Sequence, residues 1–273
     1  MTEGPEATHL AKYIAKNFKN KRLRKVSVVG GRYKHHGLPK EMNRFQDALP
    51  MKLLDVYKKG KVIFFLFENN WCMISRMGMV GWFSKPGEDK IHESDPNIVF
   101  EFENGELHYF DFRNFGTLVF TQDPMEIYSQ IDGIAPDVLD KEVTVATIDS
   151  RIEELDLSKR KPNMTLEELL MNQSLLMSGI GNIIKSEALY DAKLSPKRTV
   201  KEMSKDDWHR LFVSTRKVTK KIYKFLETRG LDFDGYFKLH AIYQRERDPR
   251  GYLVKTHKAK DGRTTFWVPE IQH

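Results

Sequence analysis

The sequence predicts an α+β fold: an N-terminal β-sandwich with a flanking helix, then a helical domain, then a terminal β-hairpin. The first observation behind this prediction is a series of short β-rich runs between residue 22 and about residue 120, separated by Gly, Asn and Pro. The second is a change to helical spacing and helix-capping signals further along the chain. The third is the return of β-rich runs at 252–268.

One helix and six strands make up the predicted first domain. Leu10, Ile14 and Phe18 follow helical spacing, and Pro5 stands where the start of a helix tolerates proline. The strand runs are 26–29, 62–67, 71–75, 98–102, 107–112 and 117–120. The segment 103–105, Glu-Asn-Gly, is typical of a hairpin turn, so neighbouring strands should pair antiparallel. A helix laid against such strands completes a β-sandwich with one flanking helix.

The second domain is predicted to be helical. Thr165 and Glu168 form a capping box that opens a helix expected to continue through Leu175. The turn 178–181, Ser-Gly-Ile-Gly, ends that helix, and a second helix is expected from Asn182 to about residue 192. A third helix is expected from the Ser204/Asp207 cap to about Gly230. The chain then returns to β structure, with runs 252–257 and 264–268 flanking a Lys-Asp-Gly turn at 260–262.

The cysteine count, the hydropathy and the charge distribution exclude several classes of protein. The chain of 273 residues contains one cysteine, Cys72, which excludes an intrachain disulfide and a multi-cysteine zinc site. No apolar run reaches transmembrane length, and residues 1–20 do not resemble a signal peptide, so an intracellular protein without a membrane partner is expected. Residues 201–273 hold 17 Lys/Arg against 10 Asp/Glu, whereas residues 1–200 hold 28 of each. The net charge of +7 therefore lies in the last quarter, which is typical either of a surface for a polyanionic partner such as nucleic acid or of a merely solvated surface.

The N-terminal segment contains the parts of a nucleophilic site. Thr2 is small enough for Met1 to be removed, and a free α-amine has a pKa of about 7.7–8.0, so part of it is neutral at neutral pH. The carboxyl group of Glu3 stands next to it and can manage protons. The alternative from these residues alone is an ordinary frayed terminus.

Two further features could bind phosphate. The turn 179–182, Gly-Ile-Gly-Asn, can direct backbone N–H groups and the Asn182 amide to a helix N-terminus, which suits an anion. The alternative is that its glycines only let two helices pack closely. Lys61 precedes an apolar strand and can either clamp a phosphate or end the strand in solvent.

Three loops could enter or grip a DNA duplex. The segments 76–81 and 111–116 lie at strand ends and carry Met79, Arg113 and Phe115, which could fill the gap left by an extruded base. Core packing is the alternative for Met79 and Phe115. Arg263 lies at a hairpin tip, where it could reach a phosphate or simply aid solubility.

The order of these motifs resembles the formamidopyrimidine-DNA glycosylase/endonuclease VIII family of base-excision repair enzymes. The resemblance covers nearly the whole chain. The matching segments are Glu-Gly-Pro-Glu at 3–6, Lys-Gly-Lys at 59–61, Met-Gly-Met at 77–79, Asp-x-Arg-x-Phe-Gly at 111–116, Gly-Ile-Gly-Asn at 179–182 and Asp-Gly-Arg at 261–263.

The resemblance implies a role for each matched residue. The Thr2 amine would be the nucleophile and Glu3 the general acid/base. Phosphates around the flipped nucleotide would be held by Lys61, Asn182 and Arg263. The vacated stack would be filled by Met79, Arg113 and Phe115, and Glu6 would line the base pocket. The domains implied are 1–140 (β-sandwich catalytic domain), 141–151 (linker), 152–230 (helix–two-turn–helix domain) and 231–273 (zincless-finger hairpin).

The chain departs from the family pattern in two places. Most members have proline where Thr2 stands, so here a primary amine would have to form the imine. The four finger cysteines are absent, which indicates a zincless finger with no metal or cofactor, held by packing around Tyr252, Phe266 and Trp267.

The expected function is that of a bifunctional DNA glycosylase/AP lyase acting on oxidised pyrimidines and ring-opened purines. The enzyme would be a monomer that binds damaged double-stranded DNA in the nucleus, the nucleoid or a viral replication site. The alternatives are an N-terminal threonine hydrolase and a non-catalytic DNA-binding protein.

Overall fold

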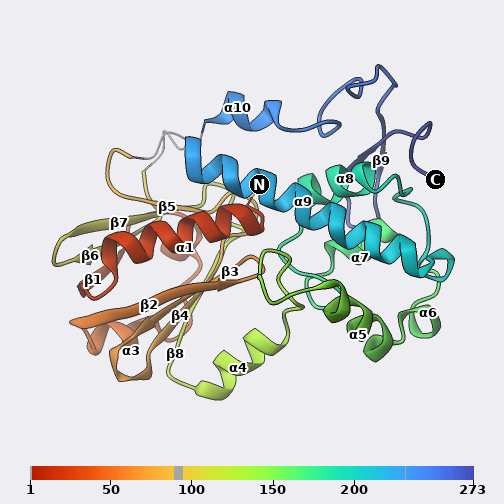
Figure 1. Cartoon of the computed structure of the whole chain (residues 1–273). Helices are drawn as coiled ribbons and strands as arrows, with labels where there is room; N and C mark the ends of the chain where they lie inside the picture. Colours follow the sequence, from red (N-terminus) through yellow and green to blue (C-terminus); the bar gives the residue numbers. More distant parts are fainter. Residues whose placement is uncertain (1, 89–94, 231) are drawn as a thin grey trace. The chain divides into compact units, whose positions relative to one another are not determined.

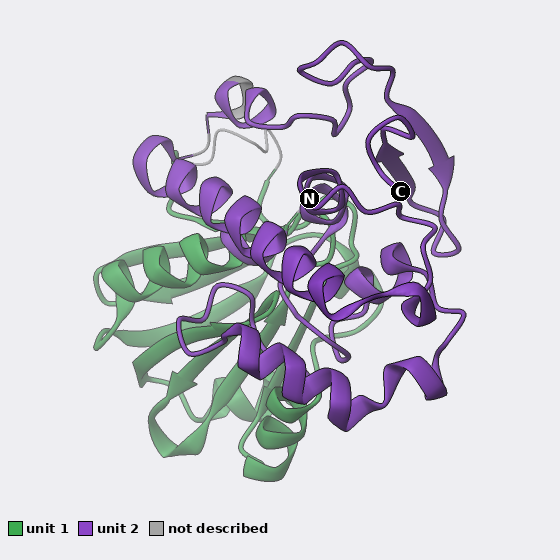
Figure 2. Cartoon of the chain, turned by 45° about the vertical axis from the view of Figure 1, so that its right-hand side comes forward, with its two compact units in different colours: residues 1–2, 6–133 green, residues 3–5, 134–273 purple. Residues whose placement is uncertain are grey.

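The computed structural model describes residues 2–88, 95–230 and 232–273. Met1, whose removal the sequence predicts, lies outside the described residues. The chain forms two compact units, coloured separately in Figure 2. Unit 1 contains residues 1–2 and 6–133, and unit 2 contains residues 3–5 and 134–273. Residues 3–5 therefore belong with the C-terminal part of the chain, although they lie between residues of unit 1 in sequence.

The described part of unit 1 contains eight antiparallel strands in the order β5-β7-β6-β1-β2-β3-β4-β8 (Figure 1). Their bounds are β1 Arg22–Val28, β2 Met51–Lys59, β3 Val62–Phe67, β4 Cys72–Arg76, β5 Trp82–Ser84, β6 Ile98–Phe102, β7 Gly105–Phe110 and β8 Thr117–Thr121. β1 and β2 pair through only Arg22↔Lys52 and Leu23↔Met51. This short pairing divides the strands into two halves of four.

The two halves pack face to face. Phe65 of β3 and Phe83 of β5 belong to different halves, and their ring centroids are 5.4 Å apart. Helix α1 (Gly4–Phe18) packs on one half, with the Phe18 ring 4.6 Å from that of Phe102 on β6. The predicted β-sandwich with a flanking helix is confirmed.

Two strands were absent from the prediction. β2 carries a register shift between Leu53 and Asp55, which interrupts the alternation of apolar and polar residues expected of a strand. β5 is three residues long, too short to show a pattern. The remaining helical elements of unit 1 are α2 (Arg32–His35), α3 (Met42–Asp47), the 3₁₀ turn η1 (Glu68–Asn70) and α4 (Pro124–Asp132).

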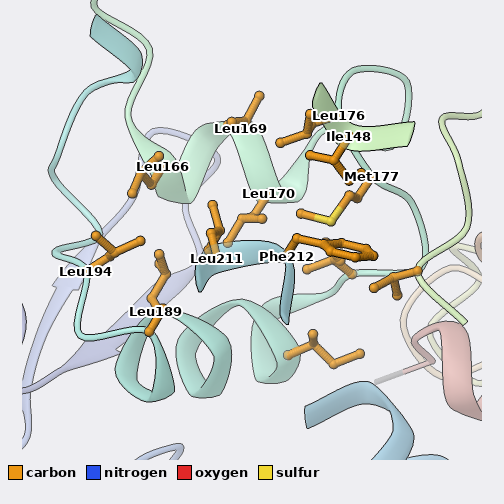
Figure 3. Packing of buried hydrophobic residues seen from close by; sticks show 14 of the residues in the cluster. Ile148, Leu166, Leu169, Leu170, Leu176, Met177, Leu189, Leu194, Leu211 and Phe212 are labelled. Atoms are coloured by element: carbon orange, nitrogen blue, oxygen red, sulfur yellow. The ribbon is translucent and has the colours of Figure 1, made fainter. Parts of the chain in front are cut away.

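Unit 2 is helical around its own apolar core. Its elements are α5 (Val145–Leu155), α6 (Leu157–Arg160), α7 (Leu166–Met171), α8 (Asn182–Asp191), the 3₁₀ turn η2 (Val200–Glu202), α9 (Lys205–Arg229) and α10 (Phe233–Lys238). Figure 3 shows Leu170 of α7 and Phe212 of α9 among the buried side chains of this core, together with Ile148 of α5. Among the residues that the structure describes, no helix is long and apolar enough to cross a membrane.

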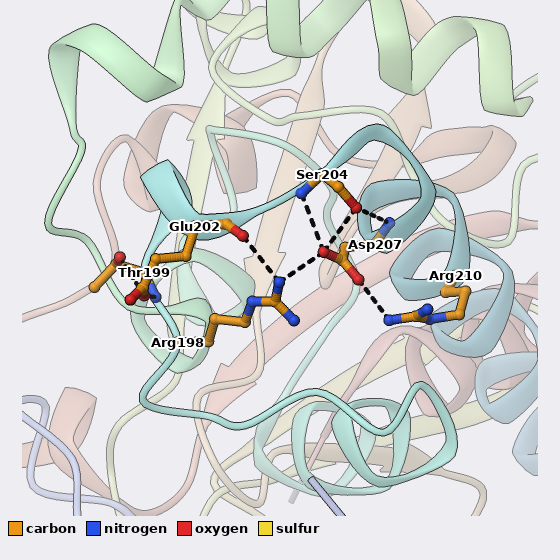
Figure 4. A network of polar contacts seen from close by, with 6 residues as sticks. All are labelled: Arg198, Thr199, Glu202, Ser204, Asp207 and Arg210. Carbon is orange, nitrogen blue, oxygen red and sulfur yellow. Dashed lines mark hydrogen bonds and ion pairs between the residues drawn. The ribbon is translucent and has the colours of Figure 1, made fainter. Parts of the chain in front are cut away.

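Capping residues set the helix starts that the sequence predicts. The Thr165 N–H donates to Glu168 at 2.9 Å, and Ser204 exchanges hydrogen bonds with Asp207 at the start of α9. Arg198 and Arg210 both bond to the Asp207 carboxylate (Figure 4). Burial alone would raise the pKa of Asp207. The hydrogen bonds from Ser204 and the charges of the two arginines have a larger, opposite effect, so the pKa lies below its ordinary value.

The sequence predicts that the helix opened by Thr165 continues to Leu175, and this prediction is wrong. α7 ends at Met171, and Asn172 adopts an extended conformation. The Asn172 side chain accepts hydrogen bonds from the N–H and hydroxyl of Ser174, which makes a local turn that competes with the helix.

The C-terminal hairpin consists of β9 (Lys255–Lys258) and β10 (Thr264–Trp267). Its base contains a small apolar cluster of Ile242, Val268 and Ile271, against which Phe266 packs. Tyr252 is 45% exposed, so its predicted place in the packing of the finger is wrong. The buried positions at the base of the hairpin are occupied by aliphatic residues instead.

Polar side chains hold the segment that leads into the hairpin. The buried Glu187 carboxylate accepts three backbone N–H bonds of 2.8–2.9 Å, from Ala241, Ile242 and Tyr243. Asp248 accepts the Tyr190 hydroxyl at 2.8 Å and the N–H of Tyr252. Burial and this carboxylate raise the pKa of Tyr190 to about 12.

Candidate active site

Thr2 is held by the turn that follows β4. Its backbone nitrogen donates to the Met79 carbonyl at 3.0 Å, and its hydroxyl donates to the Gly81 carbonyl at 3.1 Å. The residue is 6% exposed, so it is not a frayed end. The nitrogen and the hydroxyl of Thr2 are thus both held by backbone carbonyls of the same turn.

Glu3 is buried at the start of α8 within unit 2. Its two carboxylate oxygens accept the N–H groups of Ile183 at 2.8 Å and Ile184 at 3.0 Å. Helix N-termini favour negative charge, and charge-assisted hydrogen bonds fix the carboxylate rigidly. A Cβ on Gly181 would lie 2.3 Å from the carboxylate, so this approach requires glycine.

The anion-binding site predicted at this helix end therefore holds a different anion. Two backbone N–H groups in the first turn of α8 are occupied by the Glu3 carboxylate rather than left for a DNA phosphate. The motif at 179–182 positions a carboxyl group of the chain itself. The sequence could not show this, because the two segments are distant along the chain.

Asn182 of α8 is hydrogen-bonded to strand β10, which Arg263 directly precedes. Asn182 is 4% exposed, and its side-chain nitrogen donates to the Thr264 carbonyl on β10 at 2.8 Å. Arg263 precedes Thr264, and its guanidinium bonds to Asp261 at 2.6 Å. The structure thus brings together, within unit 2, two of the three residues predicted to hold phosphates.

The two loops predicted to carry void-filling residues meet in unit 1. Gly78 has a φ of +58°, and a Cβ there would lie 2.7 Å from the carbonyl carbon of Phe115. Phe115 is 56% exposed, which rules out the core-packing alternative for this residue. The Arg113 guanidinium lies 5.1 Å from the centre of the Phe115 ring. Met79 is half-buried and also accepts the Thr2 N–H through its carbonyl.

A buried carboxyl group shapes the second of these loops. Asp111 accepts the Gly116 N–H at 2.5 Å, and its own N–H donates to the Asn97 side chain at 2.6 Å. Burial raises the pKa of Asp111, although the backbone hydrogen bonds oppose this. With both ends of the loop fixed, the side chains of residues 112–115 are exposed to solvent.

Lys61 and Glu6 lie on other elements of unit 1. Lys61 is half-buried in the two-residue turn between β2 and β3, where Gly60 has a φ of +58°. Glu6 is 6% exposed in the first turn of α1.

Sequence reasoning missed a basic cavity in unit 1. Arg32, His35 and His36 line a cavity of about 590 Å³ together with loop residues 113–115. The signal was present as the run Arg-Tyr-Lys-His-His at 32–36, which the strand pattern around it obscured. The Asn114 side chain accepts the Arg32 N–H at 2.8 Å, so α2 and the loop are attached to each other. Among the residues that the structure describes, no group of three or more His, Cys, Asp and Glu is placed to hold a metal ion.

Two family models match the chain. The formamidopyrimidine-DNA glycosylase N-terminal domain matches residues 1–118, and the formamidopyrimidine-DNA glycosylase H2TH domain matches residues 134–227. Together they account for most of the chain.

Curated relatives carry the same name. Formamidopyrimidine-DNA glycosylase of Shouchella clausii is 26% identical over 292 residues, covering 100% of this chain and 99% of its own. The protein of that name from Arabidopsis thaliana is also 26% identical, covering 100% of this chain and 71% of its own.

Solved structures share the fold. Lactococcus lactis Fpg bound to AP-site DNA has a TM-score of 0.81 and 22% identity, and MutM bound to DNA with carbocyclic 8-oxo-G has a TM-score of 0.83 and 21% identity. Each match covers 99% of both chains. With the family models, the relatives and the fold in agreement, the chain belongs to the formamidopyrimidine-DNA glycosylase family of base-excision repair enzymes.

Proposed function

We propose that this protein is a bifunctional DNA glycosylase/AP lyase that uses the Thr2 α-amine as nucleophile and Glu3 as general acid/base. The observation that carries the proposal is the fixing of these two neighbouring residues, Thr2 by backbone carbonyls and Glu3 by backbone N–H groups of a helix start. A nucleophile and a proton-transfer group thus follow each other in the sequence, and each is fixed within its own unit.

The chemistry follows from these two groups. Once Met1 is removed, the Thr2 nitrogen attacks C1′ of the flipped nucleotide and the damaged base leaves with the electrons of its glycosidic bond. Glu3 takes a proton from the attacking amine and passes it to the ring oxygen, which opens the sugar and leaves an imine between C1′ and the nitrogen. Loss of the C2′ proton then expels the 3′ phosphate by β-elimination, and δ-elimination releases the 5′ phosphate.

The remaining residues hold the DNA. Phosphates next to the lesion are bound by Lys61, Asn182 and Arg263, and the space left by the flipped nucleotide is filled by Met79, Arg113 and Phe115. Glu6 lines the base pocket. The basic cavity at Arg32, His35 and His36 adds a further phosphate contact on the side of the void-filling loop.

One geometric observation weighs against a threonine hydrolase. Such an enzyme needs the Thr2 hydroxyl to give its proton to the α-amine. In this structure the hydroxyl donates to the Gly81 carbonyl instead.

The decisive experiment traps the imine. The protein is incubated with duplex DNA containing an abasic site, reduced with borohydride and separated under denaturing conditions, after intact mass has shown whether Met1 is absent. A covalent adduct on the peptide that begins with Thr2 is expected. No adduct at saturating protein would refute the lyase and leave a non-catalytic DNA-binding protein.

A second experiment addresses the primary amine. An imine from Thr2 must be protonated before it withdraws electrons, whereas proline gives an iminium that is always charged. We expect Thr2→Pro to raise strand nicking relative to base removal by several-fold, and Thr2→Ser, which keeps a primary amine, to leave the ratio unchanged. The same ratio in all three proteins would contradict this account.

Three finer features belong to the same proposal. The substrates are oxidised pyrimidines and ring-opened purines in duplex DNA, as for endonuclease VIII-like members. The finger functions without zinc, which elemental analysis of the purified protein tests. The protein acts as a monomer wherever the DNA is.

A further inference from the structure

Lys185 is a fully buried lysine in the middle of α8, with 0% of its surface exposed. Lysine is almost never buried to this extent unless its charge has partners. Burial lowers the pKa of Lys185, and the nearby Glu167, Asp261 and Glu3 carboxylates oppose that change. Nothing in the glycosylase chemistry requires this side chain, so its burial calls for a separate explanation.

A chain of polar contacts accounts for the buried charge. Lys185 Nζ donates to Thr265 Oγ1 at 2.8 Å, and Thr265 Oγ1 donates to Glu167 Oε2 at 2.5 Å. His257 Nε2 lies 3.0 Å from both oxygens of the same carboxylate. The hydroxyl of Thr265 accepts one hydrogen bond and donates one, so it joins the lysine to the glutamate. We name these four residues the finger latch.

The finger latch connects four elements of unit 2. Glu167 lies on α7, Lys185 on α8, His257 on β9 and Thr265 on β10. It runs beside the bond from Asn182 to the Thr264 carbonyl, so α8 contacts β10 through two successive residues of the strand. Arg263 directly precedes those two residues. The orientation of Arg263 therefore depends on how firmly β10 is held to α8.

The charge on Lys185 is not needed for packing alone. Replacing a buried ion pair by apolar residues of similar volume is often neutral or stabilising, whereas removing one partner is costly. A buried charged network instead fixes one geometry, because each of its hydrogen bonds forms only when donor and acceptor have the right orientation. The hairpin base already has its apolar cluster of Ile242, Val268 and Ile271.

We propose that Lys185 is a positioning residue, and that the finger latch holds β10 against α8 so that Arg263 and Asn182 are set together for a DNA phosphate. This inference rests on the proposed function for the identity of the ligand. It assigns to a buried lysine the role of orienting a finger that has no cysteine ligands.

The test is a double-mutant cycle between Lys185→Met and Arg263→Ala. Affinity is measured on duplex DNA carrying a tetrahydrofuran abasic-site analogue, which cannot form an imine. We expect Lys185→Met to weaken binding by about tenfold, the effect of losing one charge-assisted contact. In the Arg263→Ala background the same substitution should cost clearly less than tenfold, because one of the two phosphate-binding groups that the latch positions is already gone and only Asn182 remains.

Lys258→Met is the matched control. Lys258 lies on β9, is exposed and donates to the Thr264 hydroxyl at 2.9 Å, so it makes the same kind of bond without burial. Its substitution should leave affinity within about twofold. Hydrogen exchange of the peptide 255–267 gives a readout independent of DNA, and we expect faster exchange in Lys185→Met but not in Lys258→Met.

Several outcomes would overturn the proposal. One is an equal loss of affinity from Lys185→Met with and without Arg263. Another is a fall of more than about tenfold in the single-turnover nicking rate at saturating protein with unchanged affinity, which would place Lys185 in the chemical step. If Lys185→Met does not fold, the Glu167→Gln/Lys185→Met protein, which loses both charges, replaces it in the cycle. Because the analogue forms no imine, the cycle remains informative even if the borohydride experiment fails.

Discussion

The two units hold their site residues by different means. In unit 1, Thr2 and the loop 111–116 are fixed through backbone groups and close glycine contacts, and the side chains of residues 112–115 stay exposed. In unit 2, buried carboxylates fix backbone N–H groups: Glu3 holds the start of α8, and Glu187 holds residues 241–243. Exposed side chains are available to enter DNA, whereas buried charges define a rigid frame.

This difference predicts separable effects of substitution. Changes to exposed residues of unit 1 should reduce DNA processing with little effect on folding. Changes to buried polar residues of unit 2 should affect stability, and the reaction rate at saturating protein should fall as well only where the residue takes part in the chemistry.

Glu3→Gln gives the largest expected effect. The amide keeps the shape of the carboxylate but cannot transfer the proton, and its NH₂ group would face one of the two N–H donors of α8. The single-turnover rate of base removal should fall by about a thousandfold or more, and the free energy of unfolding by about 1–3 kcal/mol.

Glu187→Gln separates these two losses. Glu187 is equally buried and accepts three backbone N–H bonds, but we assign it no part in the reaction. It should lose comparable stability and keep its rate at saturating protein within a few-fold. A similar collapse of the rate in both variants would mean that Glu3 acts only on the structure.

His240 extends the comparison to pH. It is 5% exposed among Tyr236, Phe237 and Tyr243, and burial, with the charges of Lys221 and Arg245, lowers its pKa from 6.5 to about 4. His240 therefore becomes protonated near pH 6.5 in the unfolded chain, whereas in the folded protein it becomes protonated only near pH 4. Stability is intact above pH 6.5 and falls as the pH decreases toward 4, by about 2 kcal/mol at pH 5.

The His240→Phe variant should remove this loss. Chemical denaturation at pH 8 and pH 5 measures the change, and the variant should be about 2 kcal/mol less sensitive to acid than the wild type. His35→Ala, an exposed site in unit 1, serves as control and should behave as the wild type. An unchanged pH dependence in His240→Phe would show that other groups determine acid sensitivity.

The sequence was informative at most of the places where a signal is local. The capping pairs at 165/168 and 204/207, the hairpin turn at 103–105 and the helix start at Asn182 all agree with the structure, because each depends on residues a few positions apart. Strand β2 was missed since a bulge breaks its alternation, and Leu175 was placed in a helix that a local Asn172 turn ends.

The contacts that define the site are not local. Glu3 meets Ile183, 180 positions away, and Lys185 meets Thr265, 80 positions away. Motifs identified these residues as candidates, but no pattern could pair the Gly181 turn with a carboxylate rather than a phosphate. The finger latch had no signal in the sequence, because its glutamate, lysine, histidine and threonine are far apart in the chain and each residue type is typical of a surface.

Phe115→Ala tests the exposed side of the comparison. Phe115 is 56% exposed, so the free energy of unfolding should change by no more than about 0.5 kcal/mol. Base removal from duplex DNA should fall about tenfold through loss of stacking, and base removal from single strands should not, because they have no stack to refill. Tyr128→Ala, 61% exposed on α4, is the control and should alter neither. Equal losses on duplex and single-stranded DNA would contradict a void-filling role.

Arg32→Ala gives the smallest expected effect and the closest control. Arg32 lines the basic cavity, whereas Lys34 on the same short helix carries the same charge but does not. If the cavity takes a phosphate, the slope of log affinity against log salt should become shallower by about one in Arg32→Ala. It should keep its wild-type value in Lys34→Ala. Affinity at about 0.15 M salt should fall only a few-fold, because one of several phosphate contacts is lost. Equal slopes in the two variants would mean that general positive charge, rather than the cavity, attracts the DNA to unit 1.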